Sequence, residues 1–316
     1  MESIPTLDME SEDLRELSDD ARRLALGERI LAALRGIGFV YLLNHDLPES
    51  LRSSVFQTGL RFFDLPLETK LKYHRFVRAG ANGYMPPAEE DLSRSETADG
   101  AVHELKESWD MRTPDGGLPT ADAPQFGADV SALMPALSAL SLRVLGALEV
   151  ALSRPGLFST AHRRQLGAAN GSTLRAVHYP PVPGAVPVGA VRCATHSDWG
   201  SVTLLLQDQC GGLEVLSRAG RWVPAPPVPG AVLLNVGDLM EIWTGGEVVA
   251  TKHRVLVPPE ERARRCRRLS VVFFSHPDDE VTVAPPDDSQ TYQPVNAGQY
   301  LADKYNATNP SAPKQG

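Results

Sequence analysis

Apolar residues recur at helical spacing in two stretches of the first half of the chain. Residues three or four apart lie on one face of a helix, so each stretch predicts a helix with one buried face. Between them, residues 38–43 (GFVYLL) predict a short buried strand, and residues 51–63 predict a further helix. The residues that carry the helical spacing are Leu26, Ile30, Leu34 and Ile37 in the first stretch, and Leu133, Leu137, Leu140, Val144, Leu148 and Leu152 in the second.

The second half of the chain shows a different pattern, from about Ser172 onward. Short runs of β type are separated by turn sequences such as PPVPG, GG and PAPPVPG. Many short strands without helices between them are typical of an antiparallel barrel or jelly roll, not of a doubly wound sheet. The expected strands cover residues 174–179, 190–195, 201–207, 231–236, 253–257, 269–275 and 281–284.

Residues 78–126 are rich in Gly, Pro, Ser and Asp, which predicts a long loop of the kind that often covers a binding site. No internal repeat or low-complexity linker divides the sequence. We therefore expect a mainly β fold with α, in which a distorted double-stranded β-helix (jelly roll) core is flanked by N-terminal helices. Residues 1–171 would form the helix-rich region packed on the core. Residues 172–316 would form the jelly-roll region with a C-terminal helix, in one folding unit.

The composition is that of a globular protein, with 316 residues, 42% hydrophobic content and a formal net charge of -8. A net negative charge disfavours binding to nucleic acid and provides no electrostatic attraction to anionic membranes. Cys193, Cys210 and Cys266 are too few for a disulfide framework. The acidic start lacks an apolar signal segment, and no run reaches the roughly 18 apolar residues of a membrane span. We expect a cytoplasmic monomer that acts on a small molecule, with no nucleic-acid or membrane partner.

His196 and Asp198 stand two apart in an extended stretch, so strand geometry points both side chains to one face. With one further histidine they would form a 2-His-1-carboxylate face that leaves positions open on iron(II). An H-x-D pair alone is a weak signal, because it occurs by chance in many proteins. The other histidines that could supply the third ligand are His45, His74, His103, His162, His178, His253 and His276.

His253 is favoured as the third ligand because it opens the apolar run HRVLV on a later expected strand, although a lone histidine is more often a surface or core residue. Arg268 starts the strand RLSVVFF, in which period-2 alternation puts Arg268, Ser270, Val272 and Phe274 on one face. A buried arginine requires an anion. A dicarboxylate that chelates iron at one end could offer its far carboxylate to this fork. The alternative is that Arg268 ends a basic run in solvent.

With these residues in view, the sequence resembles the iron(II)/2-oxoglutarate-dependent dioxygenases of the isopenicillin-N-synthase-like family over nearly its whole length. IPTLD is similar to the family's opening strand, and GFVYLLNHDLP to its GF-x-Y-x-x-NHG signature. THSDWGSVTLLLQD resembles the H-x-D segment, GGLEV the strand that follows, and NVGDLMEIWTGG the N-x-GD segment. KHRV resembles the distal-histidine motif, and RLSVVFF the R-x-S strand. Several motifs in this order are far more specific than any one of them.

The resemblance implies a distorted jelly roll with His196, Asp198 and His253 as the iron ligands. It implies an oxidoreductase that uses Fe(II), 2-oxoglutarate and O2 to hydroxylate, desaturate or cyclise a small organic molecule, with release of succinate and CO2. Two alternatives stay open. One is a 2-oxoglutarate-independent oxidase of the isopenicillin N synthase or aminocyclopropane-carboxylate oxidase type, and the other is a non-catalytic jelly-roll binding protein.

The resemblance also implies that Arg268 and Ser270 hold the distal carboxylate of 2-oxoglutarate. Tyr179, in HYPP, matches the second tyrosine of the family's NYYP motif and is expected to help hold the co-substrate. The sequence departs from that motif, since Val177 and His178 replace its Asn and first Tyr.

Aromatic residues are the candidates for contact with the substrate. Phe274 shares the inward face with Arg268 and Ser270, and Trp199 stands beside Asp198. Phe274 could equally serve core packing, whereas Trp199 is a weaker candidate because an aromatic residue in such a place is more often part of the packing. The other two candidates, in the expected long loop, are Tyr84 and Trp109.

Overall fold

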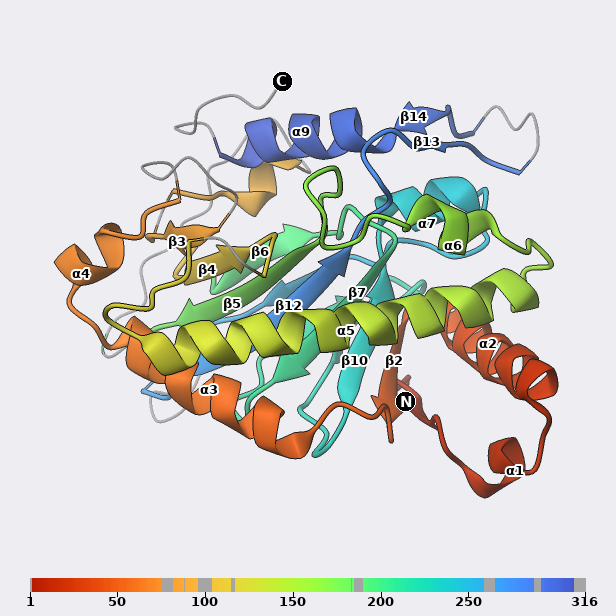
Figure 1. Cartoon of the computed structure of the whole chain (residues 1–316), viewed down its shortest axis with the longest axis horizontal. Coiled ribbons are helices and arrows are strands. Elements are labelled where there is room, and N and C mark those ends of the chain that lie inside the picture. The colour runs from red at the N-terminus through yellow and green to blue at the C-terminus, as the bar shows by residue number, and fades with distance from the viewer. Residues whose placement is uncertain are drawn as a thin grey trace.

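Two sheets form the core of the chain, and helices cover the outer face of the larger one (Figure 1). The computed structural model describes residues 2–75, 82–87, 89–95, 104–114, 117–182, 184, 190–258, 265–286 and 291–309. The large sheet is antiparallel apart from its first pair of strands. In their order across the sheet, its strands are β1 (Thr6–Asp8), β2 (Phe39–Leu43), β10 (Val232–Val236), β7 (Val202–Gln207), β12 (Arg268–Ser275), β5 (Thr173–Tyr179), β4 (Glu107–Met111) and β3 (Gly83–Met85).

The smaller sheet is antiparallel throughout. In order, its strands are β6 (Cys193–His196), β11 (His253–Val255), β8 (Leu213–Leu216) and β9 (Trp222–Pro224), and a separate pair is formed by β13 (Thr282–Val283) and β14 (Val295–Asn296). Among the described residues the sheets do not close into a continuous barrel. The expected jelly-roll core is confirmed. The large sheet takes four strands from before residue 172 and four from after it.

The strand β12 shows how the two faces of the large sheet divide. Successive side chains of a strand point to opposite faces. Leu269, Val271 and Phe273 join the apolar core under the helices. Their neighbours Arg268, Ser270, Val272 and Phe274 instead line a cavity that also has residues of the smaller sheet in its wall. The predicted alternation is therefore confirmed, and one strand serves both core and site.

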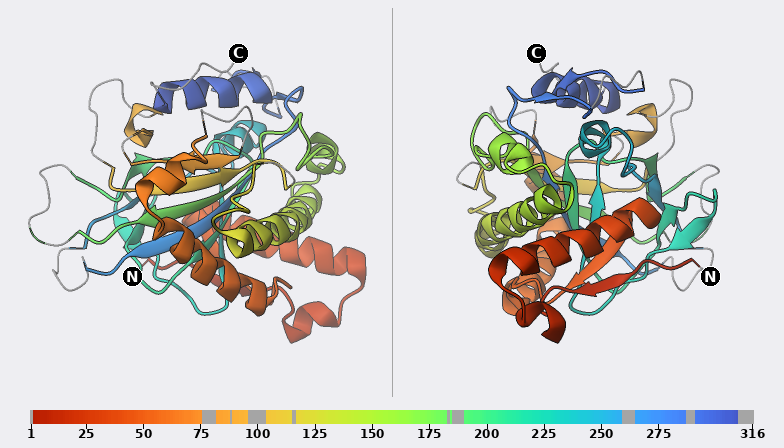
Figure 2. Two further views of the ribbon diagram at one scale, coloured as in Figure 1. Left: turned by 60° about the vertical axis from the view of Figure 1, so that its left-hand side comes forward. Right: turned by 90° about the vertical axis from the view of Figure 1, so that its right-hand side faces the viewer.

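Three long helices cover the outer face of the large sheet. The helix α5 crosses β7 and β12, with α2 and α3 packed against it (Figures 1 and 2). These three confirm the helices expected from the apolar spacing. The helices are α1 (Glu12–Arg15), α2 (Asp19–Gly36), α3 (Glu49–Phe63), α4 (Leu67–Leu71), α5 (Pro124–Ala151), α6 (Leu157–Ala161), α7 (Asp238–Trp243) and α9 (Ala297–Thr308), with a 3-10 helix η1 (Leu92–Ser95).

The helix α5 is long and apolar enough, by length and composition, to cross a membrane, which no other helix of the described chain is. Of its most apolar window, 56% is buried inside the protein. Leu133, Leu137 and Leu140 are among its buried residues and belong to the same core as β7 and β12. This is the packing of a core helix.

Residues 78–126 are not one long loop, because β3, η1, β4 and the start of α5 fall within them. The strand β4 shows no alternation in the sequence because all five of its residues are buried. Its polar residues Glu107 and Asp110 are held in the interior by ion pairs. Residues 78–81, 88, 96–103 and 115–116 of this segment lie outside the described residues. A second difference is α7, a helix that interrupts the strands where none was expected.

Buried charges join β4 and β5 to the segments beside them. Arg175 on β5 donates from Nε to Asp110 (2.6 Å) and from a terminal nitrogen to Glu90 (2.8 Å). Burial opposes the ionisation of Glu90, but Arg175 and Lys106 outweigh it and hold its pKa well below the ordinary 4.5. Cations and carboxylates match in number within this ion cluster. Its members are Arg75, Lys106, Arg175, Glu90, Glu104 and Asp110.

The helices α2 and α5 approach each other closely at Gly27. A Cβ placed on Gly27 would lie 2.1 Å from the carbonyl oxygen of Ala147 and 3.0 Å from the Cβ of Ala151. The carbonyl belongs to the backbone of α5, so it cannot move aside without separating the helices. Gly146, the neighbour of Ala147 in α5, has open space where its Cβ would be.

Gly27→Ala should lower the free energy of unfolding by about 1–3 kcal/mol, the usual range for an overpacked core. Gly146→Ala is the matched control. It should leave stability unchanged or raise it by about 0.5–1 kcal/mol, since alanine loses less backbone entropy in a helix. Urea unfolding followed by circular dichroism measures both. Equal stability of the two variants would contradict the close approach.

Glu90→Gln should destabilise the protein by about 3–5 kcal/mol at neutral pH, because it leaves buried cations without their counter-charge. Glu247→Gln, which breaks the exposed pair with Arg35, should cost less than about 1 kcal/mol. Since the pKa of Glu90 is depressed, its contribution is present above its ordinary value of 4.5 and is lost as the pH falls further. The gap between wild type and Glu90→Gln should therefore narrow in acid. A gap that stays constant down to the acid transition would contradict this account.

Candidate metal centre and the adjoining cavities

The pairing of β6 with β11 brings two histidines together. His196 lies opposite His253 in the register of the strands, with ring centroids 4.3 Å apart. Asp198 follows shortly after β6, and its Oδ1 lies 3.9 Å from His196 Nε2 and 3.7 Å from His253 Nε2. One possible ligand atom from each residue lies within 4.8 Å of the others. The three residues expected to bind a metal thus converge on one point.

Hydrogen bonds on the far side of each ring hold both histidines in the form that binds a metal. The Nδ1 of His196 lies 2.8 Å from the carbonyl oxygen of Ala194, and the Nδ1 of His253 lies 3.1 Å from that of Thr251. A carbonyl oxygen can only accept, so each Nδ1 carries the proton. Nε2 is therefore the nitrogen that each ring offers when it gives up its other proton to a metal ion, as in the usual arrangement of ligating histidines.

Asp198 is held in its ionised form although it is buried. Burial alone would raise its pKa, but His253, His196 and hydrogen bonds from Asn235 and Thr203 outweigh it, so the pKa lies below its ordinary value. Asn235, on β10, donates from Nδ2 to Oδ2 of Asp198 at 2.6 Å. The other oxygen, Oδ1, faces the histidines and is left to bind a metal ion.

The donor set fits iron(II), because two imidazoles and one carboxylate on one face are the arrangement of non-haem iron oxygenases. The chain around Asp198 is tightly packed. A Cβ on Gly237 would lie 2.8 Å from the Asp198 carbonyl oxygen and 2.7 Å from the nitrogen of Gly200. The backbone nitrogen of Asp238 also donates to the Asp198 carbonyl oxygen at 2.8 Å. The turn before α7 therefore fixes the segment that carries the carboxylate.

A buried guanidinium without an acidic partner lies between the same two sheets. Arg268 is 1% exposed, and its terminal nitrogens donate to Ser270 Oγ and Gln207 Oε1, both at 3.1 Å. Its Nε has no hydrogen-bond partner, and no carboxylate of the described residues pairs with it. Because a buried charge is costly unless it is paired, this pocket requires an anion.

Tyr179 completes the anion site. Its ring centroid lies 4.9 Å from the Arg268 guanidinium, and its hydroxyl interacts with Ser270. Burial raises the pKa of Tyr179 to about 12, so the hydroxyl stays protonated and can donate to an anion. The register of β12 and β5 places Arg268 directly opposite Tyr179. The structure therefore brings together all three residues expected to bind 2-oxoglutarate.

A cavity between the sheets, here called the smaller cavity, has both the metal ligands and the anion site in its wall. Val177, which replaces the Asn of the NYYP motif, contributes an apolar side chain to this wall. His178 points to the other face, where its Nδ1 lies 2.8 Å from Glu107 and its ring stacks on Phe63. The two departures from the motif thus have different consequences, and only Val177 changes the cavity.

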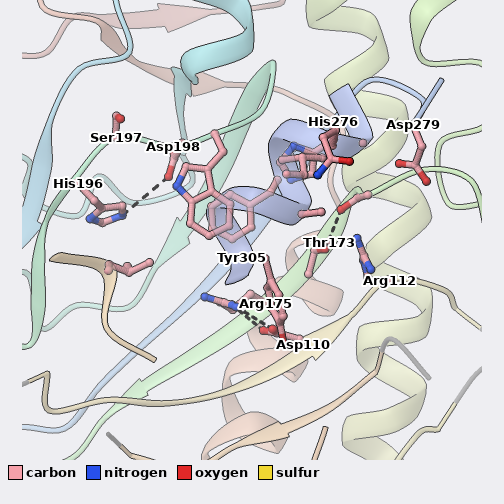
Figure 3. Close-up of a pocket in the computed structure, with 18 of the residues that line it drawn as sticks. Asp110, Arg112, Thr173, Arg175, His196, Ser197, Asp198, His276, Asp279 and Tyr305 are labelled. Carbon is pink, nitrogen blue, oxygen red and sulfur yellow. Dashed lines mark hydrogen bonds and ion pairs between the residues drawn. The ribbon is translucent and has the colours of Figure 1, made fainter. Parts of the chain in front are cut away.

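A larger cavity of about 420 Å³ opens beside the smaller one, a size within the range of small-molecule sites (Figure 3). His196, Asp198 and Phe274 line both cavities. Molecules held in the two cavities can therefore meet at the metal centre. Other parts of its wall come from β4, β5 and α9.

The four aromatic residues expected to contact substrate separate into two pairs. Trp199 and Phe274 line the larger cavity. Tyr84 and Trp109 line neither cavity. They are 0% and 1% exposed, and both rings pack against Phe62 in the helical core. The structure does not bring Tyr84 and Trp109 to the site, because β3 and β4 direct them toward the helices.

Several residues of the site were not predicted from the sequence. His276 and Arg175 continue the alternation of Phe274 on β12 and of Tyr179 on β5, so extending the period-2 pattern would have found them. Arg112 and Asp279 also line the larger cavity but follow the ends of their elements, where no pattern indicates direction. Asn235 lies within the NVGDLM motif, yet only the structure shows its bond to Asp198.

Comparison with known proteins also indicates a non-haem iron oxygenase. Residues 170–277 match the 2OG-Fe(II) oxygenase superfamily, and residues 4–131 match the N-terminal region of non-haem dioxygenases in morphine synthesis. The chain is 32% identical to proline hydroxylase buaE of Petromyces alliaceus, over 88% of this chain and 90% of the relative. It is 30% identical to the validamycin A dioxygenase of Streptomyces hygroscopicus subsp. limoneus, over 90% and 79% of the two chains.

Solved structures agree with the sequence comparison. A full-length Neurospora crassa protein in complex with alpha-KG superposes with a TM-score of 0.80 at 28% identity, covering 96% of this chain and 95% of that one. The same Neurospora crassa protein with alpha-KG and thymine gives a TM-score of 0.79, with 94% and 95% covered. The chain belongs to the 2OG-Fe(II) oxygenase superfamily and is an oxidoreductase that depends on Fe(II) and 2-oxoglutarate.

Proposed function

We propose that His196, Asp198 and His253 hold the Fe(II) of this oxygenase and that Arg268, Ser270 and Tyr179 hold its 2-oxoglutarate. The observation that carries the 2-oxoglutarate assignment is the buried Arg268. It has no carboxylate partner in the described chain, and it lines the smaller cavity together with His196, Asp198 and His253. A dicarboxylate bound to the metal at one end would supply that partner at the other. Relatives named as 2-oxoglutarate-dependent argue against the 2-oxoglutarate-independent alternative, and the complete triad argues against a non-catalytic protein.

When bound, Fe(II) would let O2 act as the oxidant: one oxygen atom oxidises 2-oxoglutarate to succinate and CO2, and the other enters the substrate on hydroxylation or leaves as water on desaturation or cyclisation. The residues of the chain position and protect these groups. The imidazoles present Nε2, Asn235 aims the carboxylate of Asp198, and Arg268 with Ser270 fixes the far end of the co-substrate. The sheets exclude water around them, which strengthens each of these interactions.

The larger cavity is the site we assign to the substrate, a small organic molecule that is hydroxylated, desaturated or cyclised. His196 and Asp198 line both this cavity and the smaller one, so a substrate in the larger cavity would lie next to the co-substrate. Relatives associated with small molecules support this class of substrate. Proline hydroxylase buaE is named for proline, and the similar Neurospora crassa protein was crystallised with thymine. A cytoplasmic location and a monomeric state stay predictions.

Asn235→Ala should weaken Fe(II) binding about 10- to 100-fold, the usual effect of losing a residue that orients a metal ligand. Asp198 would keep its place on the chain but lose the bond that aims its carboxylate. Anaerobic titration with Fe(II) measures the affinity, and thermal unfolding checks the fold. Wild-type affinity in Asn235→Ala would contradict the role given to Asn235. Retained stoichiometric binding in His196→Ala would overturn the metal site itself.

Arg268→Lys should weaken 2-oxoglutarate binding about 10-fold or more and leave Fe(II) affinity unchanged, because a lysine cannot make the two parallel bonds of a guanidinium. The matched control is Arg267→Lys, since Arg267 is exposed and pairs with Asp64 at the surface. The visible charge-transfer band of the anaerobic Fe(II) and 2-oxoglutarate complex reports binding in all three proteins. Equal 2-oxoglutarate affinity in Arg268→Lys and Arg267→Lys would contradict the assignment of Arg268 to the co-substrate. Absence of the band in iron-loaded wild type would contradict it as well.

A further inference from the structure

The charged side chains of the larger cavity are of two kinds. Arg75 and Arg175 both bind Asp110, and Arg175 also binds Glu90, so these charges are satisfied within the ion cluster. Arg112 and Asp279 are not members of that cluster. Both residues line the cavity, and neither has an ion-pair partner in the described part of the chain.

Arg112 presents a free guanidinium to the cavity. Its backbone is fixed, because its backbone nitrogen donates to Asn82 Oδ1 at 2.6 Å. Its side chain makes no ion pair or hydrogen bond with any described residue, although it is only partly exposed. Burial lowers the pKa of Arg112 from its ordinary 12.5, as expected for a cation that is largely out of water and has no bound anion. An arginine remains charged under these conditions, so the cavity wall carries a positive charge here.

Asp279 presents a free carboxylate to the same cavity. Its backbone is fixed between Ala169 and Gly298 by hydrogen bonds of 3.0 and 3.1 Å, whereas its side-chain oxygens bind nothing in the described part of the chain. Burial raises the pKa of Asp279, and the charge of Arg112 partly opposes that rise. The two groups therefore sense each other but do not form an ion pair.

The position of this pair relative to the metal centre defines the direction of a ligand. Figure 3 shows Arg112 and Asp279 on the opposite side of the cavity from His196 and Asp198. Apolar side chains line the wall as well, namely Trp199, Phe274 and Leu301 of α9. A molecule that spans the cavity would meet charges at one end and the metal at the other, with apolar surface along its length.

Two uncharged polar groups in the wall also lack partners. The hydroxyl of Tyr305 and the Nδ1 of His276 are buried and make no hydrogen bond within the described chain. Burial lowers the pKa of His276 to about 3, so its ring is neutral at physiological pH and adds no further charge. Both residues line the larger cavity. Both atoms are closed off from the cavity, and the Nδ1 of His276 lies against Gly200, so neither adds an accessible polar group to Arg112 and Asp279.

We propose that the larger cavity binds a small zwitterion with the head group of an α-amino acid, its carboxylate on Arg112 and its ammonium on Asp279. An apolar side chain would then extend between Trp199 and Phe274 toward the metal centre. This inference rests on the proposed function, since it takes the metal centre as the place of oxidation. It adds the chemical class of the substrate and the two residues that select it.

Other ligand classes match the cavity less well. A neutral molecule would leave both charges unpaired in a partly dry site, and a simple carboxylic acid would leave Asp279 unpaired beside a second carboxylate. An amine would leave Arg112 unpaired. A site built to bond a particular group rejects analogues that lack it strongly, because its own polar groups are then left unpaired.

The binding test uses the anaerobic protein loaded with Fe(II) and 2-oxoglutarate, titrated calorimetrically with the proteinogenic L-amino acids. For any that binds, its des-amino acid and its carboxamide are titrated next. We expect at least one apolar amino acid to bind, and both analogues to bind about 10-fold more weakly or worse. Succinate formation that depends on the same amino acid gives a second readout. Failure of every amino acid to bind, or equal binding of the analogues, overturns the proposal.

Two variants that remove one charge each assign the roles of the charges. Arg112→Met should abolish the preference for the amino acid over its carboxamide, and Asp279→Asn should abolish its preference over the des-amino acid. A merely structural role would weaken all ligands alike and would not remove one preference selectively. The matched controls are Arg164→Met and Glu280→Gln, which remove the exposed pair that Arg164 and Glu280 form at 3.0 Å next to Asp279. Preferences that survive in both cavity variants overturn the assignment.

The same experiment separates this inference from the proposed function. If the wild type fails to bind 2-oxoglutarate or Fe(II) before any amino acid is added, the proposed function has failed. If both bind with the expected charge-transfer band but no amino acid follows, only the substrate class has failed. The band should also be unchanged in Arg112→Met and Asp279→Asn, because neither residue lines the smaller cavity.

Discussion

The register of β6 against β11 is the constraint on which the rest of the site depends. It sets His196 opposite His253, and a shift by one residue would turn one of the two rings to the other face of the sheet. The carbonyl bonds to Nδ1, the packed turn at Gly237 and the bond from Asn235 all refine a position that this pairing has already given. The facing strand β12 then needs only its own alternation to bring Arg268 and Ser270 within reach of the same space.

Charge compensation explains how so many ionisable groups are kept in the interior. The ion cluster around Arg175 is balanced by the chain itself and ties β4 and β5 together. Arg268 donates hydrogen bonds to the hydroxyl of Ser270 and the amide oxygen of Gln207, but neither group balances its charge. Within the described chain, Arg112 and Asp279 are satisfied in neither respect. Buried groups that a protein balances internally contribute to its architecture, whereas those left open indicate what it receives from outside.

Much of this was predictable from the sequence where a pattern has a geometric meaning. The helical spacing from Leu26 and from Leu133, the alternation on RLSVVFF and the order of the motifs predicted the helices, the inward face of β12 and the grouping of the triad. The strand β4 was missed because burial on both faces removes alternation, and its polar residues resemble loop residues until their partners are known. Tyr84 and Trp109 were expected in a loop near the substrate because β3 and β4, the buried strands that carry them, were not recognised in the sequence. Arg112 lies beyond the end of a strand, where direction depends on tertiary packing.

The helix α9 and its N-cap residue form one wall of the larger cavity, and the lining residues there are Asn296, Gly298, Gln299, Leu301, Ala302 and Tyr305. None of these residues lines the smaller cavity, whose wall is made largely by the sheets. The part of the larger cavity formed by α9 can thus change without a change in the wall of the smaller cavity. Replacing residues along α9 can remodel what the enzyme accepts while the iron and co-substrate sites are inherited unchanged, which gives this architecture a short evolutionary route from one substrate to another.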